Sequence, residues 1–218
     1  MDGVIDISRA RELVGNAVLW PRVRDFLWDF APSIHGSWIE ELKVEKLKVE
    51  TFSSPRVKRF ILDALGVEPC FHVFPKEDGS RLLLLDGKTL ESVVQWLGAL
   101  ACEEELRKVT DGATVRTLKA ALPGVYPEVF GYMAYFRKLK VEKLKVEKLD
   151  PQSIVEMGVA ILFTSVSSLP KPLLRRLALK LPFNLSTIQP FNHSTFQLSN
   201  LQLLLKLRFP EAYSICCS

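Results

Sequence analysis

Three consecutive amphipathic helices are predicted between residues 89 and 139, and they constrain the fold more than any other part of the chain. In the first, Leu90, Val94 and Leu97 recur at the spacing that stacks side chains on one face of an α-helix. The other two carry similar stripes, formed by Val115, Leu118 and Leu122 and by Val129, Tyr132, Met133 and Phe136. Because apolar stripes of this width have to be buried, the three helices are expected to share one core.

Residues typical of helix ends mark the boundaries of this stretch. Thr110 or Asp111 can accept the free amide hydrogens at the start of the second helix, which is expected to end at Pro123-Gly124. Pro127 falls in the first turn of the third helix, where a missing N–H costs nothing.

Further helices are expected on both sides of this stretch. Upstream, residues 21–30 and 55–65 keep the helical spacing of apolar side chains, the latter with Phe60 inward and Gly66 as its end. Downstream, Asp150 is expected to cap a helix, in which Gly158 indicates close contact with another helix. Pro172 begins a second helix, and a third leads into the C-terminal residues. Between Cys70 and Asp86 two short apolar runs flank the turn-forming PKEDGS, which predicts a β-hairpin.

The fold class predicted from these patterns is mainly α, with an orthogonal-type helical domain and one short β-hairpin at about residues 70–86. The 218 residues, of which 48% are hydrophobic, are enough for a single domain with one core. Residues 1–88 form its N-terminal helical part in this prediction, and residues 89–218 form the rest.

Low-complexity segments interrupt the helical pattern at about residues 41–50, 139–148 and 184–200. The first two contain LKVEKLKVE, whose period of five fits neither a helix nor a strand, so no single face can be buried. The third resembles the amino-acid sequence that the reverse complement of the same DNA repeat would encode. We therefore interpret all three as repeat-derived insertions at the surface.

Composition and charge favour a cytosolic protein without a leader peptide. The net charge of +4 comes from interleaved acidic and basic residues, and Asp2 and Asp6 stand where a signal peptide needs positive charge. The apolar run at 154–169 is too short to span a membrane and contains Glu156. The four cysteines have no spacing typical of a metal site or a disulfide framework, so reduced thiols are expected.

A search for chemistry finds no catalytic signature, so we expect no enzyme activity, cofactor or metal. Cys70 and His72 could point to the same side of a strand, but two ligands do not make a zinc site. The run Glu103 to Glu105 at a helix end is typical of a solvated charge cluster. The four tryptophans are interpreted as core anchors.

The candidate partner-binding residues are Arg175, Arg176 and Lys180, which share one face of the helix that begins at Pro172. They could contact phosphate, a membrane surface or an acidic partner, or form a simple solvated face. Three charges are fewer than the basic stripe that nucleic-acid-binding proteins usually show.

Three segments carry a resemblance to a known family. WLGALACEEELRKVTDGATVRTLKAAL, LDPQSIVEMGVAILFTSVSSLPKPLLRRLALKLP and LQLLLKLRFPEAYSICCS resemble, in their order and layout, the SctK/YscK (OrgA/MxiK) accessory proteins of type III secretion sorting platforms. The resemblance covers about residues 90–218, and the N-terminal third is only loosely similar.

This resemblance implies a cytoplasmic, non-enzymatic adaptor at the cytosolic face of the inner membrane. The implied partners are the cytoplasmic domain of the inner-membrane ring protein (SctD-like) and the pod protein (SctQ-like). The alternative from the residues themselves is a nucleic-acid-binding regulator, in which the turn at 110–113 belongs to a helix-turn-helix and exposes Arg116 and Lys119.

Overall fold

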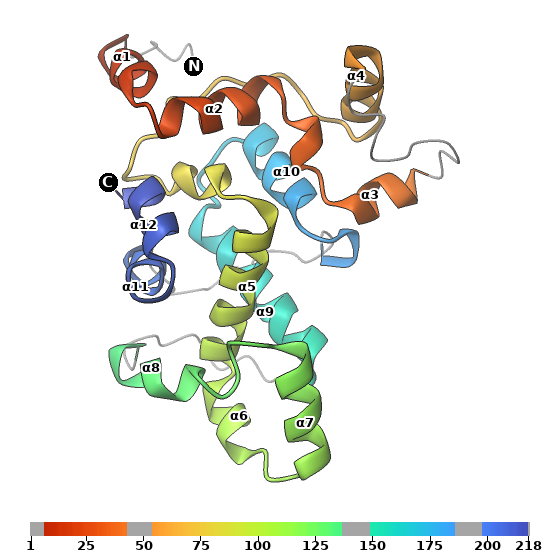
Figure 1. Cartoon of the computed structure of the whole chain (residues 1–218), viewed down its shortest axis with the longest axis vertical. Helices are drawn as coiled ribbons and strands as arrows, with labels where there is room; N and C mark the ends of the chain where they lie inside the picture. Colours follow the sequence, from red (N-terminus) through yellow and green to blue (C-terminus); the bar gives the residue numbers. More distant parts are fainter. Residues whose placement is uncertain (1–6, 43–53, 137–148, 186–197, 218) are drawn as a thin grey trace. The chain divides into compact units, whose positions relative to one another are not determined.

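The described chain folds almost entirely into helices, which confirms the mainly α prediction. The computed structural model describes residues 7–42, 54–136, 149–185 and 198–217 (Figure 1). Most of the three predicted insertions, including the whole of 139–148, lies outside these residues. None of the described helices is long and apolar enough to span a membrane.

The chain divides into two compact units. Unit 1 comprises residues 1–87, 168–186 and 210–218, and unit 2 comprises residues 88–167 and 187–209. A single domain over 1–218 stays a prediction.

Unit 1 is built from short helices of the N-terminal part together with segments that return from the end of the chain. Its elements are α1 (Ile7–Gly15), α2 (Leu19–Trp28), η1 (Ala31–Ser33), α3 (Gly36–Glu41), α4 (Pro55–Ala64), η3 (Ser80–Leu84), α10 (Lys171–Lys180), η4 (Phe183–Leu185) and α12 (Pro210–Cys217). As the spacing predicts, Val23, Phe26 and Leu27 of α2 are buried. Gly66 follows α4 with a φ of +65°, which confirms the predicted end of that helix.

Unit 2 contains the three predicted central helices with an extra one between the first two. Its elements are α5 (Gly87–Ala101), α6 (Glu103–Lys108), α7 (Gly112–Ala121), α8 (Val129–Phe136), α9 (Pro151–Ser165) and α11 (Leu198–Arg208). Asp111 and Asp150 accept hydrogen bonds from the amides of Thr114 and Ser153, so both are N-caps. The side chains of Met133 and Phe136 lie outside the described set.

A pair of facing glycines brings α5 and α9 into backbone contact (Figure 1). A Cβ added to Gly98 would lie 1.8 Å from the carbonyl oxygen of Ile154, and one added to Gly158 would lie 1.9 Å from that of Val94. Since no side chain fits at either place, the close contact predicted from Gly158 is confirmed. Gly98 is its partner on the other helix.

The predicted hairpin at 70–86 is not confirmed. No strand occurs among the described residues, and 80–84 of this segment form the 3₁₀ helix η3. Gly79 adopts a φ of +74°, the Asp78 side chain accepts the Ser80 amide, and the Arg81 guanidinium donates to the Phe74 carbonyl. Leu82 to Leu85 are all buried, whereas a strand with one solvated face would expose alternate residues. The four leucines are therefore all buried by a short 3₁₀ helix that the rest of the unit encloses.

Candidate partner-binding site

The helix α10 carries the three predicted cations and lies inside unit 1. Pro170 precedes it and Pro172 occupies its first turn, which favours a helix start there. Leu173 and Leu177 are buried as the spacing predicts. The opposite face is enclosed too, because Arg176 and Lys180 are only 3% and 4% exposed.

Arg176 joins α10 to the C-terminal end of α2. Its Nη1 donates to the carbonyl of Phe26 at 2.5 Å, and its Nη2 donates to the carbonyl of Glu68 at 3.1 Å. The guanidinium also lies over the rings of Phe26 and Phe30, 5.6 and 5.2 Å from their centroids. The last carbonyls of a helix have no partner within the helix, and a cation there also opposes the helix dipole. Arg176 thus caps α2 from a distant part of the chain.

Arg175 does the same for α4. Its Nε and Nη2 donate to the carbonyl of Leu65, the residue that ends α4, at 3.1 and 2.9 Å. Its guanidinium lies 4.9 Å from the ring centroid of Trp38. Unlike Arg176, this side chain is only half-buried.

Lys180 closes η3. Its Nζ donates to the carbonyls of Leu83 at 2.6 Å and Leu85 at 2.7 Å, and lies 5.1 Å from the ring centroid of Phe26. Two carbonyls and one aromatic face therefore surround the amine. Burial lowers the pKa of Lys180 to about 7, while the charge of Asp86 opposes this shift and that of Arg22 adds to it.

Together the three cations connect α10 to the ends of α2, α4 and η3. A simple solvated face is therefore wrong for Arg176 and Lys180, whose charged groups are hydrogen-bonded in the core of unit 1. The sequence pattern could not reveal this, because their partners are backbone carbonyls about 100 or more residues away. The role of Arg175, Arg176 and Lys180 in partner binding stays a prediction.

Lys180 gives the stability of the protein a pH dependence. The pKa is about 7 in the folded chain against an ordinary 10.5, so the unfolded chain binds more protons between these values and stability rises with pH. We expect Lys180→Met to reduce this rise by up to about 1.4 kcal/mol per pH unit. Urea unfolding of both proteins from pH 7 to 9 measures the difference. Equal slopes for the two proteins would contradict a buried, titrating Lys180.

A second titration with the opposite sign begins at the upper end of that pH range, but it is common to both proteins and cancels in their difference. Burial raises the pKa of the Cys102 and Cys216 thiols from 9 to about 12. Folded thiols keep their protons above pH 9, where the unfolded ones lose theirs, so their contribution to stability falls there as pH rises.

Cys70 and His72 face different partners and form no ligand pair. Nε2 of His72 lies 3.0 Å from Oδ2 of Asp78. Burial raises the pKa of the Cys70 thiol, and the neighbouring Arg176 guanidinium opposes that shift. The described residues contain no group of three or more side chains that could hold a metal ion.

The tryptophans divide between core and surface. Trp38 and Trp96 are 5% and 3% exposed, which confirms the interpretation as core anchors for these two. The interpretation is wrong for Trp28, which is 60% exposed at the end of α2. Phe60 of α4 is also exposed, by 53%, because α4 packs through the stripe of Ile61 and Leu65 and turns Phe60 outward.

All the large apolar side chains that are exposed in the described part of the chain lie in unit 1. They are Val14, Val18, Trp28, Phe60 and Phe71. Sequence reasoning missed them because their spacing is compatible with core positions. One signal could have indicated such residues: these helices carry more apolar side chains than a single buried face can hold.

The helices proposed as a helix-turn-helix do not form a clearly basic surface. Arg116 and Lys119 of α7 are exposed. However, the first turn of α6 carries Glu103, Glu104 and Glu105, and Glu103 accepts a hydrogen bond from Arg107 at 2.6 Å. These carboxylates would repel a phosphate backbone.

These features define a helical protein whose buried cations hold its segments together and whose exposed aromatic side chains are available for contact. Residues 25–128 match the family described as YOP proteins translocation protein K (YscK). Over this segment, the match supports the predicted SctK/YscK family of type III secretion proteins. No match was found among curated proteins or among solved structures.

The matched segment shifts where the family likeness lies. It shares residues 90–128 with the predicted span and adds 25–89, most of which lies in the N-terminal third, where the resemblance is only loose. Residues 129–218 lie outside the match, and the likeness predicted there stays a prediction. Trp28, Phe60 and Phe71 fall inside the matched segment.

Proposed function

We propose that the protein is a non-enzymatic adaptor of a type III secretion system. It links the cytoplasmic domain of the SctD-like ring protein to the SctQ-like pod protein at the cytosolic face of the inner membrane. The family match over residues 25–128 is the observation that carries this proposal, because it supports a role in type III secretion.

The surface of unit 1 supports a role in protein contacts. Exposed aromatic side chains are enriched in protein interfaces, and Trp28, Phe60 and Phe71 are each more than half exposed. Of the three candidate residues on α10, Arg175 is the half-buried one, so direct partner contact is proposed for it. Arg176 and Lys180 contribute by fixing the ends of α2 and η3.

A cavity in unit 1 is smaller than the sites that usually hold small molecules. It measures about 100 Å³ and is lined by residues of α1, the α1–α2 turn and the segment 73–81, including Glu12, Asn16 and Arg81. Ligand sites for small molecules usually measure about 300 Å³ or more. The cavity is thus too small for a typical substrate.

Binding to each partner tests the proposal. The full chain is titrated by calorimetry with the ring protein's cytoplasmic domain and, separately, with the pod protein of the same secretion system. We expect saturable binding to both, with a Kd of about 10 µM or tighter, as for specific protein contacts. A duplex DNA of mixed sequence is the control. Salt-sensitive binding to the DNA with none to either protein would overturn the adaptor proposal in favour of a regulator.

A further inference from the structure

Two indole rings and an arginine form a surface patch on α2, in which Trp20 is half-buried and Arg24 and Trp28 are exposed. We call Trp20, Arg24 and Trp28 the α2 patch. These residues are four positions apart, which places them along one side of the helix. The rings of Trp20 and Trp28 meet edge to face with centroids 6.0 Å apart. Trp28 is 60% exposed, and the side chain of Arg24 is 61% exposed.

The geometry of the patch favours binding. Indole rings that already contact each other lose little conformational freedom when a partner covers them, and tryptophan and arginine are the residues most enriched among binding hot spots. The remainder of α2 is fixed, because Val23, Phe26 and Leu27 are buried and Arg176 holds the carbonyl of Phe26. The patch is therefore a rigid surface.

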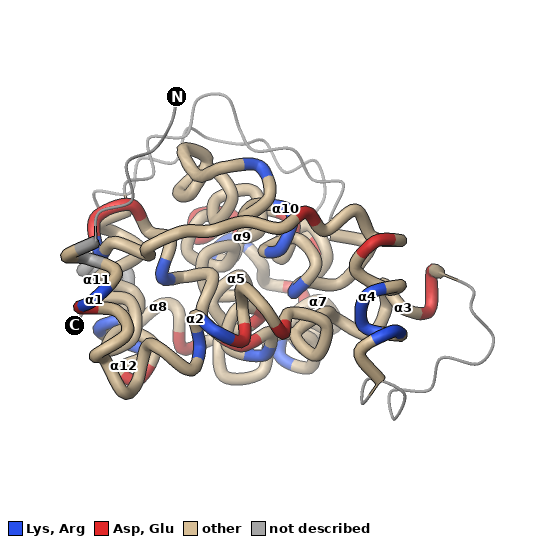
Figure 2. Tube along the Cα trace, turned by 90° about the horizontal axis from the view of Figure 1, so that it is seen from above, with Lys and Arg blue, Asp and Glu red and all other residues tan. Residues whose placement is uncertain are grey.

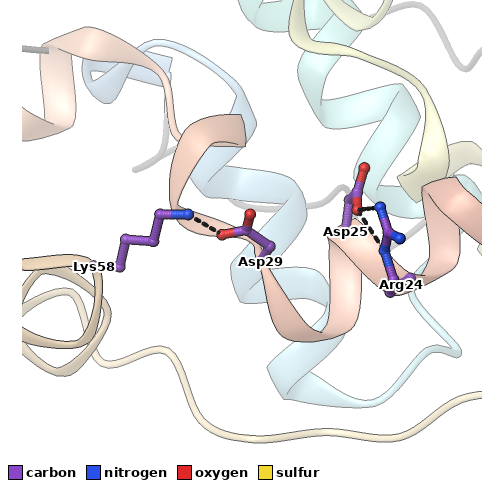
Figure 3. A network of polar contacts seen from close by, with 4 residues as sticks. All are labelled: Arg24, Asp25, Asp29 and Lys58. Atoms are coloured by element: carbon purple, nitrogen blue, oxygen red, sulfur yellow. Dashed lines mark hydrogen bonds and ion pairs between the residues drawn. The ribbon is translucent and has the colours of Figure 1, made fainter. Parts of the chain in front are cut away.

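Ion pairs match the carboxylates that border the patch. Figure 3 shows that Arg24 donates to Asp25 and that Lys58 of α4 reaches Asp29, at 2.9 and 2.7 Å. Both carboxylates of this end of α2 are thus matched by a cation. Lys and Arg mark much of α4, the helix from which Lys58 reaches Asp29 (Figure 2).

We propose that the α2 patch binds an acidic protein segment in which an apolar side chain accompanies a carboxylate. The apolar side chain packs on the two indoles, and the carboxylate accepts hydrogen bonds from Arg24. The guanidinium of Arg24 has five N–H groups, and its Nε and Nη2 each direct one of them to Asp25. Exposed ion pairs such as Arg24–Asp25 contribute about 1 kcal/mol or less, so this pair opens readily for a better acceptor. The proposal rests on the proposed function, since it names the surface by which the adaptor holds one of its two partners.

A nucleic-acid strand is the competing occupant, because bases stack on indoles and phosphates bind arginine. The ring geometry favours protein. Trp20 and Trp28 meet edge to face at 64°, so they do not offer two parallel faces on which successive bases could stack.

The test uses the full chain, the variants Trp28→Ala and Arg24→Glu, and the control Phe71→Ala. Phe71 is 54% exposed, so all three substitutions spare the core. We expect both patch variants to bind one of the two proteins, the ring domain or the pod protein, at least about 30-fold more weakly, while binding of the other protein and the control stay within about two-fold. Acrylamide quenching of tryptophan fluorescence should also fall when that partner is added to the native chain, and fall less in Trp28→Ala.

The outcomes separate the two proposals. If the native chain binds neither protein, the adaptor role fails. If it binds both and the patch variants bind as tightly as the control, the α2 patch is not the surface and only the present inference fails. Loss of binding to a single-stranded oligonucleotide in both patch variants, with protein binding retained, would assign the patch to nucleic acid.

Discussion

Gly158→Ala is expected to lower the free energy of unfolding by about 3 kcal/mol, although alanine is the better helix former by about 1 kcal/mol. The added Cβ would lie 1.9 Å from the Val94 carbonyl oxygen and 2.7 Å from its carbon. Both atoms belong to the backbone of α5, so no side-chain rotation can relieve the overlap, and α5 and α9 have to move apart. Urea or thermal unfolding followed by circular dichroism measures the change.

A matched control exists in the same unit. Gly131 in α8 is exposed, and a Cβ added there meets no atom within 4 Å. Gly131→Ala should therefore leave stability unchanged or raise it by up to about 1 kcal/mol. If Gly158→Ala behaves like this control, the backbone contact between α5 and α9 is wrong.

Gly98 gives an internal check on the same contact, because it faces Gly158 across the crossing. Gly98→Ala alone should destabilise by a similar amount. The double substitution should cost less than the sum of the two, since helices already separated by one methyl group accommodate the second more easily. Strict additivity would indicate two independent sites.

Arg176→Met is the second substitution with a large expected effect, a loss of about 3 kcal/mol in the free energy of unfolding. Methionine keeps much of the apolar stem but leaves the buried carbonyl of Phe26 without the donor that it has now, and it also removes the part-buried bond to the Glu68 carbonyl. It also removes the cation that lies over Phe26 and Phe30. Removing a buried charge offsets part of this cost, since burial lowers the pKa of Arg176 and so disfavours the charged form.

Arg56→Met is the control for that experiment. Arg56 is an exposed arginine of α4 in the same unit, and its replacement should change stability by less than about 0.5 kcal/mol. Arg176→Lys should not restore the lost stability, because a lysine ammonium lacks the branched guanidinium whose two Nη atoms reach separate carbonyls. A neutral effect of Arg176→Met would show that the capping bonds of α10 do not stabilise unit 1.

The helices of this chain could be predicted where local chemistry decides them. Asp111 and Asp150 cap their helices as expected, and Gly66 ends α4, because each of these signals acts within one turn of the chain. The leucine run that forms η3 was mistaken for a strand. Its conformation depends on Lys180, almost 100 residues away, which holds the carbonyls of Leu83 and Leu85.

The candidate site was harder to predict for the same reason. A helical wheel assigns Arg176 to a polar face, yet this face meets carbonyl groups at the ends of other helices and not water. Conversely, Trp28 looks like a core residue and is exposed. Sequence periodicity predicts which residues share a face, but it does not show what covers that face.

The bridging activity of an adaptor is tested most directly by mixing three proteins. The full chain, the ring protein's cytoplasmic domain and the pod protein are combined at micromolar concentration and separated by size-exclusion chromatography with light scattering. The adaptor account predicts one species that contains all three proteins, and no complex of ring domain with pod protein when the chain is left out. Competition, in which the chain binds either partner but never both together, would contradict it.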